Sequence, residues 1–175
     1  MAHDTGRRTF LARAFGVLAT IYASLLGVPV VRYLLSPLRH PTMREPDAFV
    51  RIGRIADFPL HRPVRVSVTA DLLDAWNRLE EVRLGSVWVV RTSENDFRVF
   101  STICPHLGCG IGWEAQKERF SCPCHDSHFR IDGTRIGGPA PRGMDTLEFK
   151  IEAKDVFVKY VRFVTGTKER RVIAG

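Results

Sequence analysis

Four cysteines and two histidines in one short stretch constrain this chain more than any other feature. The stretch runs from Cys104 to Ser127, contains all four cysteines of the chain, and reads CPHLGCGIGWEAQKERFSCPCHDS. A C-x-H unit and a C-x-x-H unit each supply one thiolate and one imidazole, with a further cysteine close to each. Two thiolates and two imidazoles suit either a tetrahedral zinc ion or a [2Fe–2S] cluster in which two histidines replace two cysteines.

The full pattern resembles the Rieske proteins of cytochrome bc-type quinol oxidoreductases. C-x-H-L-G-C is followed by C-P-C-H-x-S, and the later segment 137–141 (GGPAP) is similar to the proline loop that covers the cluster in that family. The resemblance favours a [2Fe–2S] cluster over structural zinc, because zinc would leave the two further cysteines unexplained. The specific part of the match ends at Pro141, and residues 49–100 match only in their strand-like character.

The resemblance also implies a role for each residue of the motif. The ligands and the disulfide would be Cys104 and Cys122 on one iron, His106 and His125 on the other, and Cys109 bonded to Cys124. The Ser127 hydroxyl would donate to a bridging sulfur, and Leu107 would keep water off the cluster. Gly108 and Gly110 are expected to allow tight turns that bring backbone amides near the sulfurs.

His106 and His125 are the candidate catalytic residues. Each ligand imidazole keeps one ring nitrogen free, so that electron and proton uptake are linked on the same group. One of the two is expected to contact the hydroxyl group of a quinol.

Two residues depart from the pattern of the high-potential members of the family. Phe129 stands where a tyrosine hydroxyl would contact a cysteine sulfur, and Asp126 replaces a glycine before Ser127. A lost donor and an added anion both disfavour the reduced cluster, which makes menaquinol a more suitable electron donor than ubiquinol or plastoquinol. His128 lies outside the motif and is expected to be a surface residue.

The N-terminal region predicts export and a membrane anchor. Residues 1–13 include Arg7-Arg8 in the sequence GRRTFL, which resembles a twin-arginine signal. Residues 14–35 form an apolar segment of 22 residues, against about 20 needed to span a membrane. Pro29 is expected to kink this helix. Basic residues before the span place the N-terminus in the cytoplasm, and hence the cluster domain on the outer, periplasmic face of a bacterial inner membrane.

The remaining boundaries follow from composition. Residues 36–46 contain three prolines and predict an extended tether, which acts as a hinge in the resembling family. Residues 47–165 would form the cluster domain, with the cluster subdomain at about 101–142, and residues 166–175 a basic C-terminal tail. Two cysteines in a disulfide would require an oxidising compartment.

Short alternating segments predict an all-β domain of antiparallel sheets after the single N-terminal transmembrane helix. They are rich in β-branched and aromatic residues and lie at 64–68, 87–90, 97–103, 147–151 and 156–164. Asp71–Glu81 (DLLDAWNRLEE) is the exception: Leu72, Leu73, Trp76 and Leu79 recur at helical spacing, which predicts a short helix on the sheet.

The function favoured by this pattern is the Rieske subunit of a quinol–cytochrome c oxidoreductase. Such a subunit passes an electron from quinol, bound at a cytochrome b subunit, to a c-type cytochrome, and is not active alone. The alternative is the small Rieske subunit of a periplasmic molybdenum oxidase such as arsenite oxidase. The net charge of +7 is dispersed along the chain without a basic helix, so we expect no nucleic-acid partner.

Overall fold

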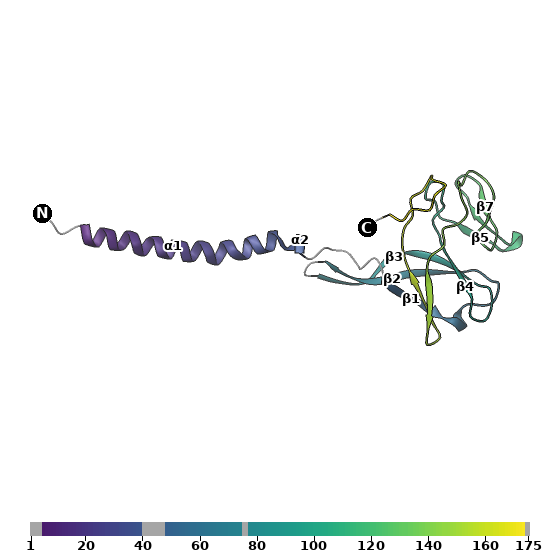
Figure 1. Cartoon of the computed structure of the whole chain (residues 1–175), viewed down its shortest axis with the longest axis horizontal. Coiled ribbons are helices and arrows are strands. Elements are labelled where there is room, and N and C mark those ends of the chain that lie inside the picture. Colours follow the sequence, from purple (N-terminus) through teal and green to yellow (C-terminus); the bar gives the residue numbers. More distant parts are fainter. Residues whose placement is uncertain (1–4, 40–47, 75–76, 174–175) are drawn as a thin grey trace. The chain divides into compact units, whose positions relative to one another are not determined.

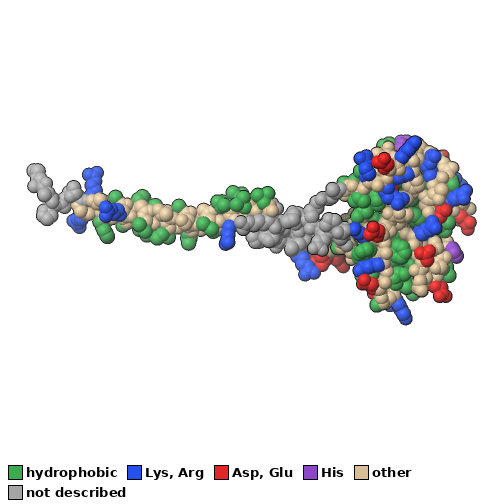
Figure 2. Space-filling model, viewed as in Figure 1, with side chains coloured by type: hydrophobic (Ala, Val, Ile, Leu, Met, Phe, Trp, Pro, Cys, Tyr) green, Lys and Arg blue, Asp and Glu red, His purple; other side chains and the backbone are tan. Residues whose placement is uncertain are grey.

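The N-terminal part of the chain is one long apolar helix. The computed structural model describes residues 5–39, 48–74 and 77–173. Helix α1 (Thr5–Leu34) has 30 residues, which corresponds to a length of about 45 Å. Exposed apolar side chains cover it along its length (Figure 2). Within the described residues it is the one helix long and apolar enough to cross a membrane.

The helix differs from the expected anchor at both ends. It begins at Thr5 rather than Ala14, so the paired arginines lie within its first turns, and it continues through Pro29. The tether was expected to be extended from its first residue, but Ser36–Arg39 form the short helix α2. The remainder of the tether, residues 40–46, lies outside the described residues.

The remaining described residues form a domain of three sheets (Figure 1). The first sheet has the order β1 (Phe49–Arg54), β10 (Asp155–Lys159) and β9 (Phe149–Glu152). The second has the order β2 (Val64–Asp74), β3 (Asn77–Arg91) and β4 (Phe97–Ser101). The third has the order β5 (Gly112–Glu114), β6 (Arg119–Cys122), β7 (Ser127–Phe129) and β8 (Arg135–Gly137). Two 3-10 turns, η1 (Ile55–Asp57) and η2 (Ala115–Lys117), complete the elements, and the all-β prediction is confirmed.

The helix predicted over Asp71–Glu81 is wrong, because Asp71–Asp74 belong to β2 and Asn77–Glu81 to β3, which are neighbouring strands of one sheet. Asp71 on β2 accepts hydrogen bonds from the Arg78 guanidinium at 2.8 Å and from the Glu81 amide at 3.1 Å on β3. The helical period of the leucines was outweighed by strand pairing, which continues from the buried part of both strands. Leu79 is 46% exposed, and Trp76 lies outside the described residues.

The middle sheet separates two hydrophobic cores. Side chains on a strand alternate between the two faces. Val87 and Val89 therefore pack in the core shared with β1 and β10, whereas Trp88 and Val90 pack in the core of the third sheet. Burial on both faces explains why residues 87–90 form an unbroken apolar run. The second core also contains Cys104 and Cys122, so the candidate metal centre is built directly on it.

Candidate metal centre

The first ligand loop, residues 102–111, connects β4 to β5 and is closed by its own backbone. The Cys104 amide donates to the Cys109 carbonyl at 2.7 Å, and the Gly108 amide donates to the Cys104 carbonyl at 3.0 Å. Gly108 has a φ of +83°, as expected for a glycine in a tight turn, whereas Gly110 does not have a positive φ. Trp88 anchors the end of the loop, because its indole Nε1 donates to the Ile111 carbonyl at 3.0 Å.

Two free thiols lie at the bottom of the site. Cys104 at the start of this loop and Cys122 at the end of β6 are 0% and 2% exposed and belong to no disulfide. Burial raises the pKa of the Cys104 thiol to about 11, and the adjacent Cys122 sulfur adds to the rise. A bound metal ion relieves this cost because it takes the place of the thiol proton. The two buried cysteines outside any disulfide therefore remain available as a pair of thiolate ligands.

The two histidines of the motif lie together, nearer to solvent than the thiols. His106 is partly buried and His125 is exposed. Their rings come from different loops and meet edge to face, with centroids 4.7 Å apart and planes at 88°. The structure thus separates a buried pair of sulfur donors from an outer pair of imidazoles. This donor set fits a cluster with two thiolates on one iron and two histidines on the other.

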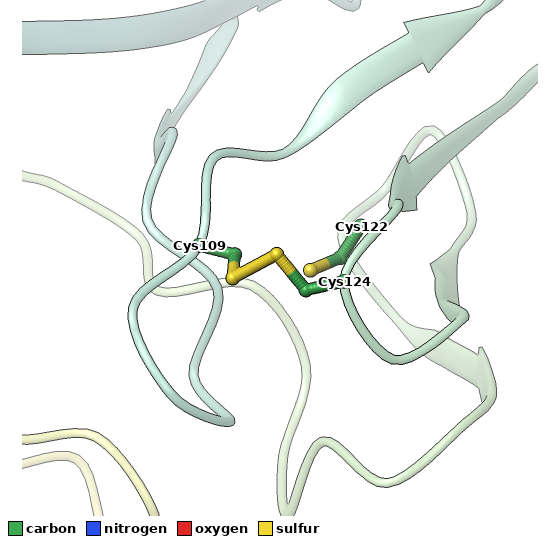
Figure 3. A group of neighbouring side chains, drawn as sticks. All are labelled: Cys109, Cys122 and Cys124. Carbon is green, nitrogen blue, oxygen red and sulfur yellow. A yellow bond between two sulfur atoms is a disulfide. The ribbon is translucent and has the colours of Figure 1, made fainter.

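A disulfide joins the first ligand loop to the second, residues 122–127. The bond links Cys109 to Cys124, with an S–S distance of 2.16 Å (Figure 3). The Cys122 sulfur is close to this bridge, since the three sulfur atoms lie within 4.8 Å of one another. That group is not itself a metal site, because sulfur in a disulfide is not a thiolate. The bridge also removes the possibility of a zinc ion held by four thiolates.

Ser127 lies in the interior of the site. It is 0% exposed, and its Oγ accepts a hydrogen bond from the Ala140 amide at 3.1 Å. The Ser127 hydroxyl lowers the pKa of the Cys104 thiol, although the larger effect of burial still raises it. Phe129 is fully buried in the same core and brings no hydroxyl to the cysteines.

Asp126 and His128 form a pair beside the second ligand loop. Asp126 has a φ of +56°, a left-handed conformation in which glycine carries no Cβ penalty. Its side chain is 90% exposed, and one carboxylate oxygen lies 3.0 Å from Nε2 of His128. The prediction that His128 is a surface residue is wrong: its side chain is 14% exposed, and Nδ1 is buried without a hydrogen-bond partner in the described part of the chain.

The proline loop, residues 137–141, packs on the second ligand loop. Gly138 has a φ of +83°, and a Cβ atom there would lie 2.4 Å from the Asp126 carbonyl oxygen and from the Ser127 Cα. A side chain is therefore excluded at this position. Together with the Ala140–Ser127 hydrogen bond, this close approach fixes the proline loop against the segment that carries His125.

Leu107, which was expected to keep water off a cluster, is 63% exposed.

One contact of the site carried no sequence signal. Residues 166–173, expected to be a tail, fold back on the domain: Phe163 and Val172 form a β-bridge, and the Gly166 amide donates to the Pro105 carbonyl at 2.8 Å. No spacing pattern connects these distant residues, so only the fold could reveal the contact.

Several known proteins are similar to this chain. The sequence model of the Rieske [2Fe-2S] domain matches residues 49–149. The menaquinol:cytochrome c reductase iron-sulfur subunit of Bacillus subtilis is 30% identical over 160 residues, which cover 89% of this chain and 91% of that protein. The cytochrome b6-f complex iron-sulfur subunit of Chlorobaculum thiosulfatiphilum is 24% identical over 155 residues, with coverage of 89% and 76%. A chain of the hyperthermophilic respiratory Complex III is 19% identical with a TM-score of 0.47, covering 83% of this chain and 98% of that one.

Proposed function

This chain belongs to the Rieske [2Fe–2S] family, and we propose on that premise that it is the subunit of a quinol–cytochrome c oxidoreductase that takes electrons from quinol. The observation that carries the proposal is the division of the donor set into buried thiols and an outer histidine pair. An exposed imidazole can meet a substrate hydroxyl while the sulfur side of the site stays dry.

Four residues would hold the cluster: Cys104 and Cys122 on one iron, and His106 and His125 on the other. When bound, such a cluster takes up one electron at a potential between roughly −150 and +300 mV. The two thiols would bind the cluster on the buried side of the site, where water is excluded, and the buried Ser127 hydroxyl would serve there as a donor to sulfur, consistent with its lowering of the Cys104 pKa. This donor favours extra negative charge on the sulfur side of the site.

The histidines would handle the proton. Each has one ring nitrogen that is not a ligand, and that nitrogen can accept the proton of a quinol hydroxyl as the electron is taken up. His125 is the better placed of the two, because it is exposed whereas His106 is partly buried. The disulfide restrains the two loops, so that both imidazoles keep the spacing that the site needs.

Menaquinol is the proposed electron donor, and a c-type cytochrome the proposed acceptor. Phe129 adds no hydroxyl to the buried core, and Asp126 adds a carboxylate beside the second ligand loop. Both differences disfavour the reduced state and so suit a donor of low potential. Two relatives that are 30% identical are named as menaquinol:cytochrome c reductase subunits, which supports the same choice.

Helix α1 would anchor the chain in the membrane. Its exposed apolar surface needs a lipid environment, and its length exceeds the hydrocarbon thickness of about 30 Å. Arg7, Arg8 and Arg13 near its start favour the cytoplasmic side for the N-terminus. The cluster domain would then face the opposite, outer side, where a cytochrome b subunit presents the quinol.

The proposal is tested on protein isolated from membranes in mild detergent. We expect two irons and two labile sulfides per chain, a reduced EPR spectrum with a low average g-value, and a co-purifying cytochrome b. His125→Ala should abolish this spectrum, whereas His128→Ala, a matched change three residues away, should retain it. Stoichiometric zinc without iron would contradict the cofactor assignment. A co-purifying molybdopterin subunit would instead support the molybdenum oxidase alternative.

A further inference from the structure

The C-terminal strap, residues 163–173, contacts the backbone of the first ligand loop at Thr165 and Gly166. The Gly166 amide donates to the Pro105 carbonyl at 2.8 Å, one residue before His106. A Cβ atom at Gly166 would lie 3.7 Å from the His106 carbonyl oxygen, and one at Gly108 would lie 4.0 Å from Cγ2 of Thr165. The strap therefore contacts the loop at the residue that presents the partly buried imidazole.

Arg142 holds the strap in this position. Its guanidinium donates through Nη2 to the Val164 carbonyl at 2.8 Å and through Nη1 to the Thr167 carbonyl. These two carbonyls flank Gly166, so the hydrogen bonds fix the turn that contacts Pro105. The same guanidinium forms a bidentate ion pair with Asp145, in which Nε lies 2.8 Å from Oδ1 and Nη2 lies 2.8 Å from Oδ2.

The Arg142 ion pair is buried. The side chains of Arg142 and Asp145 are 9% and 4% exposed. A buried pair of this kind is weak as a source of net stability, because both charges lose their hydration. The pair instead restrains the geometry of the segments. All three guanidinium nitrogens donate hydrogen bonds, and the planar group therefore permits few other arrangements of the segments that it connects.

The loops that carry His125 and His106 pack against different segments, the proline loop and the C-terminal strap. Arg142 connects these two segments. The proline loop packs on the His125 side through Gly138 and Ala140, whereas the strap packs on the His106 side. Arg142 directly follows the last residue of the proline loop and is hydrogen-bonded to the strap. We propose that Arg142 is a positioning residue that sets the placement of His106 relative to His125.

Lysine at position 142 separates positioning from charge. Arg142→Lys keeps a cation for Asp145 but has one nitrogen, which cannot reach the carboxylate and two carbonyls together. Arg170 also pairs with Asp145, at 3.3 Å, so the carboxylate keeps a second partner in the variant. A suitable control is Arg119→Lys, which alters another arginine–carboxylate pair of the same subdomain, Arg119 with Glu114 at 3.2 Å.

The experiment uses the full chain, purified with its cluster, and three measurements. Hydrogen exchange of peptides covering residues 163–168 should be at least about tenfold faster in Arg142→Lys. The reduced EPR spectrum should broaden, because the histidine placement becomes heterogeneous. Modification by diethylpyrocarbonate, followed by mass spectrometry, should rise at His106 relative to His125. Arg119→Lys should leave all three measurements at the wild-type values.

A second variant tests the contact without changing the ion pair. Gly166→Ala has space for its Cβ, but the φ of +74° at this position strains any other residue and should displace the strap. It should reproduce the EPR broadening and the change at His106, and it carries the test if Arg142→Lys does not fold.

The inference rests on the proposed ligand set, and the two can fail separately. A wild-type protein without the Rieske-type spectrum would remove the ligand set itself. If wild type shows that spectrum and the strap exchanges faster in either variant, while the spectrum and the His106 reactivity stay unchanged, the strap is merely structural. Unchanged exchange in both variants would equally overturn the positioning role of Arg142.

Discussion

Replacing Gly138 with alanine should separate the proline loop from the second ligand loop. The new Cβ would lie 2.4 Å from the Asp126 carbonyl oxygen and 2.7 Å from the Ser127 nitrogen, and both are backbone atoms that cannot rotate away. Ordinary contacts of this kind begin near 3.4 Å. The loop must therefore move by about 1 Å, which is enough to break the Ala140–Ser127 hydrogen bond of 3.1 Å.

The size of the effect follows from two contributions. A non-glycine residue in a left-handed conformation, here a φ of +83°, costs about 1–2 kcal/mol. Loss of one hydrogen bond in the interior adds about 1 kcal/mol. The free energy of unfolding should therefore fall by about 2–3 kcal/mol. For a domain of this size that lowers the melting temperature by roughly 8–12 °C.

The assay pairs thermal unfolding with voltammetry of the cluster. The midpoint potential should also fall, because Ser127 loses the partner that orients its hydroxyl toward the site. Gly110→Ala is the matched control, since it lies in the first ligand loop and a Cβ there meets nothing within 4 Å. If the two variants melt at the same temperature and have the same potential, the close packing of the proline loop does not support the site.

Four other variants test the redox tuning, the bridge and the export route. Phe129→Tyr should raise the midpoint potential by several tens of millivolts, a fraction of a charged hydrogen bond worth about 1.5–3 kcal/mol, where 1.4 kcal/mol corresponds to about 59 mV. Asp126→Gly should raise it less because the carboxylate is exposed, and no rise in either film voltammogram would remove the basis for menaquinol. Cys109→Ala should destabilise the domain by about 2–5 kcal/mol and reduce cluster retention. Free thiols at Cys109 and Cys124 of the wild type in non-reducing mass spectrometry would contradict the bridge. Arg7→Lys combined with Arg8→Lys keeps the charge but should stop assembly on the outer face, and normal assembly would show that the pair acts only on topology.

Local spacing was enough to predict the class of the fold and to propose a set of ligands. A C-x-H unit places a thiolate and an imidazole on one short loop whatever the rest of the chain does, so Cys104 and His106 could be proposed together. The β-branched and aromatic residues at 87–90 likewise predicted a strand, which is found as part of β3 and is buried on both faces.

The two strands that replace the expected helix show where local pattern fails. The leucines around Asp71 repeat at helical spacing, yet the strands that contain them are continuous with the paired central sheet. The energy of pairing and burial along a long strand exceeds a propensity difference of a few tenths of a kcal/mol per residue. The propensity difference can be estimated from the sequence, whereas the energy of strand pairing and burial depends on the tertiary structure.

The sequence by itself was enough to propose the donor set and to predict the apolar N-terminal segment and the antiparallel character of the domain, because each depends on residues close together in the chain. Only the tertiary structure decided that Arg142 grips the strap and that Gly166 supports Pro105. These contacts join segments far apart in sequence, and a single arginine or glycine has no periodicity that marks its partner. Their geometry is set by how the sheets bring three loops to one end of the domain, which depends on the packing of the whole chain.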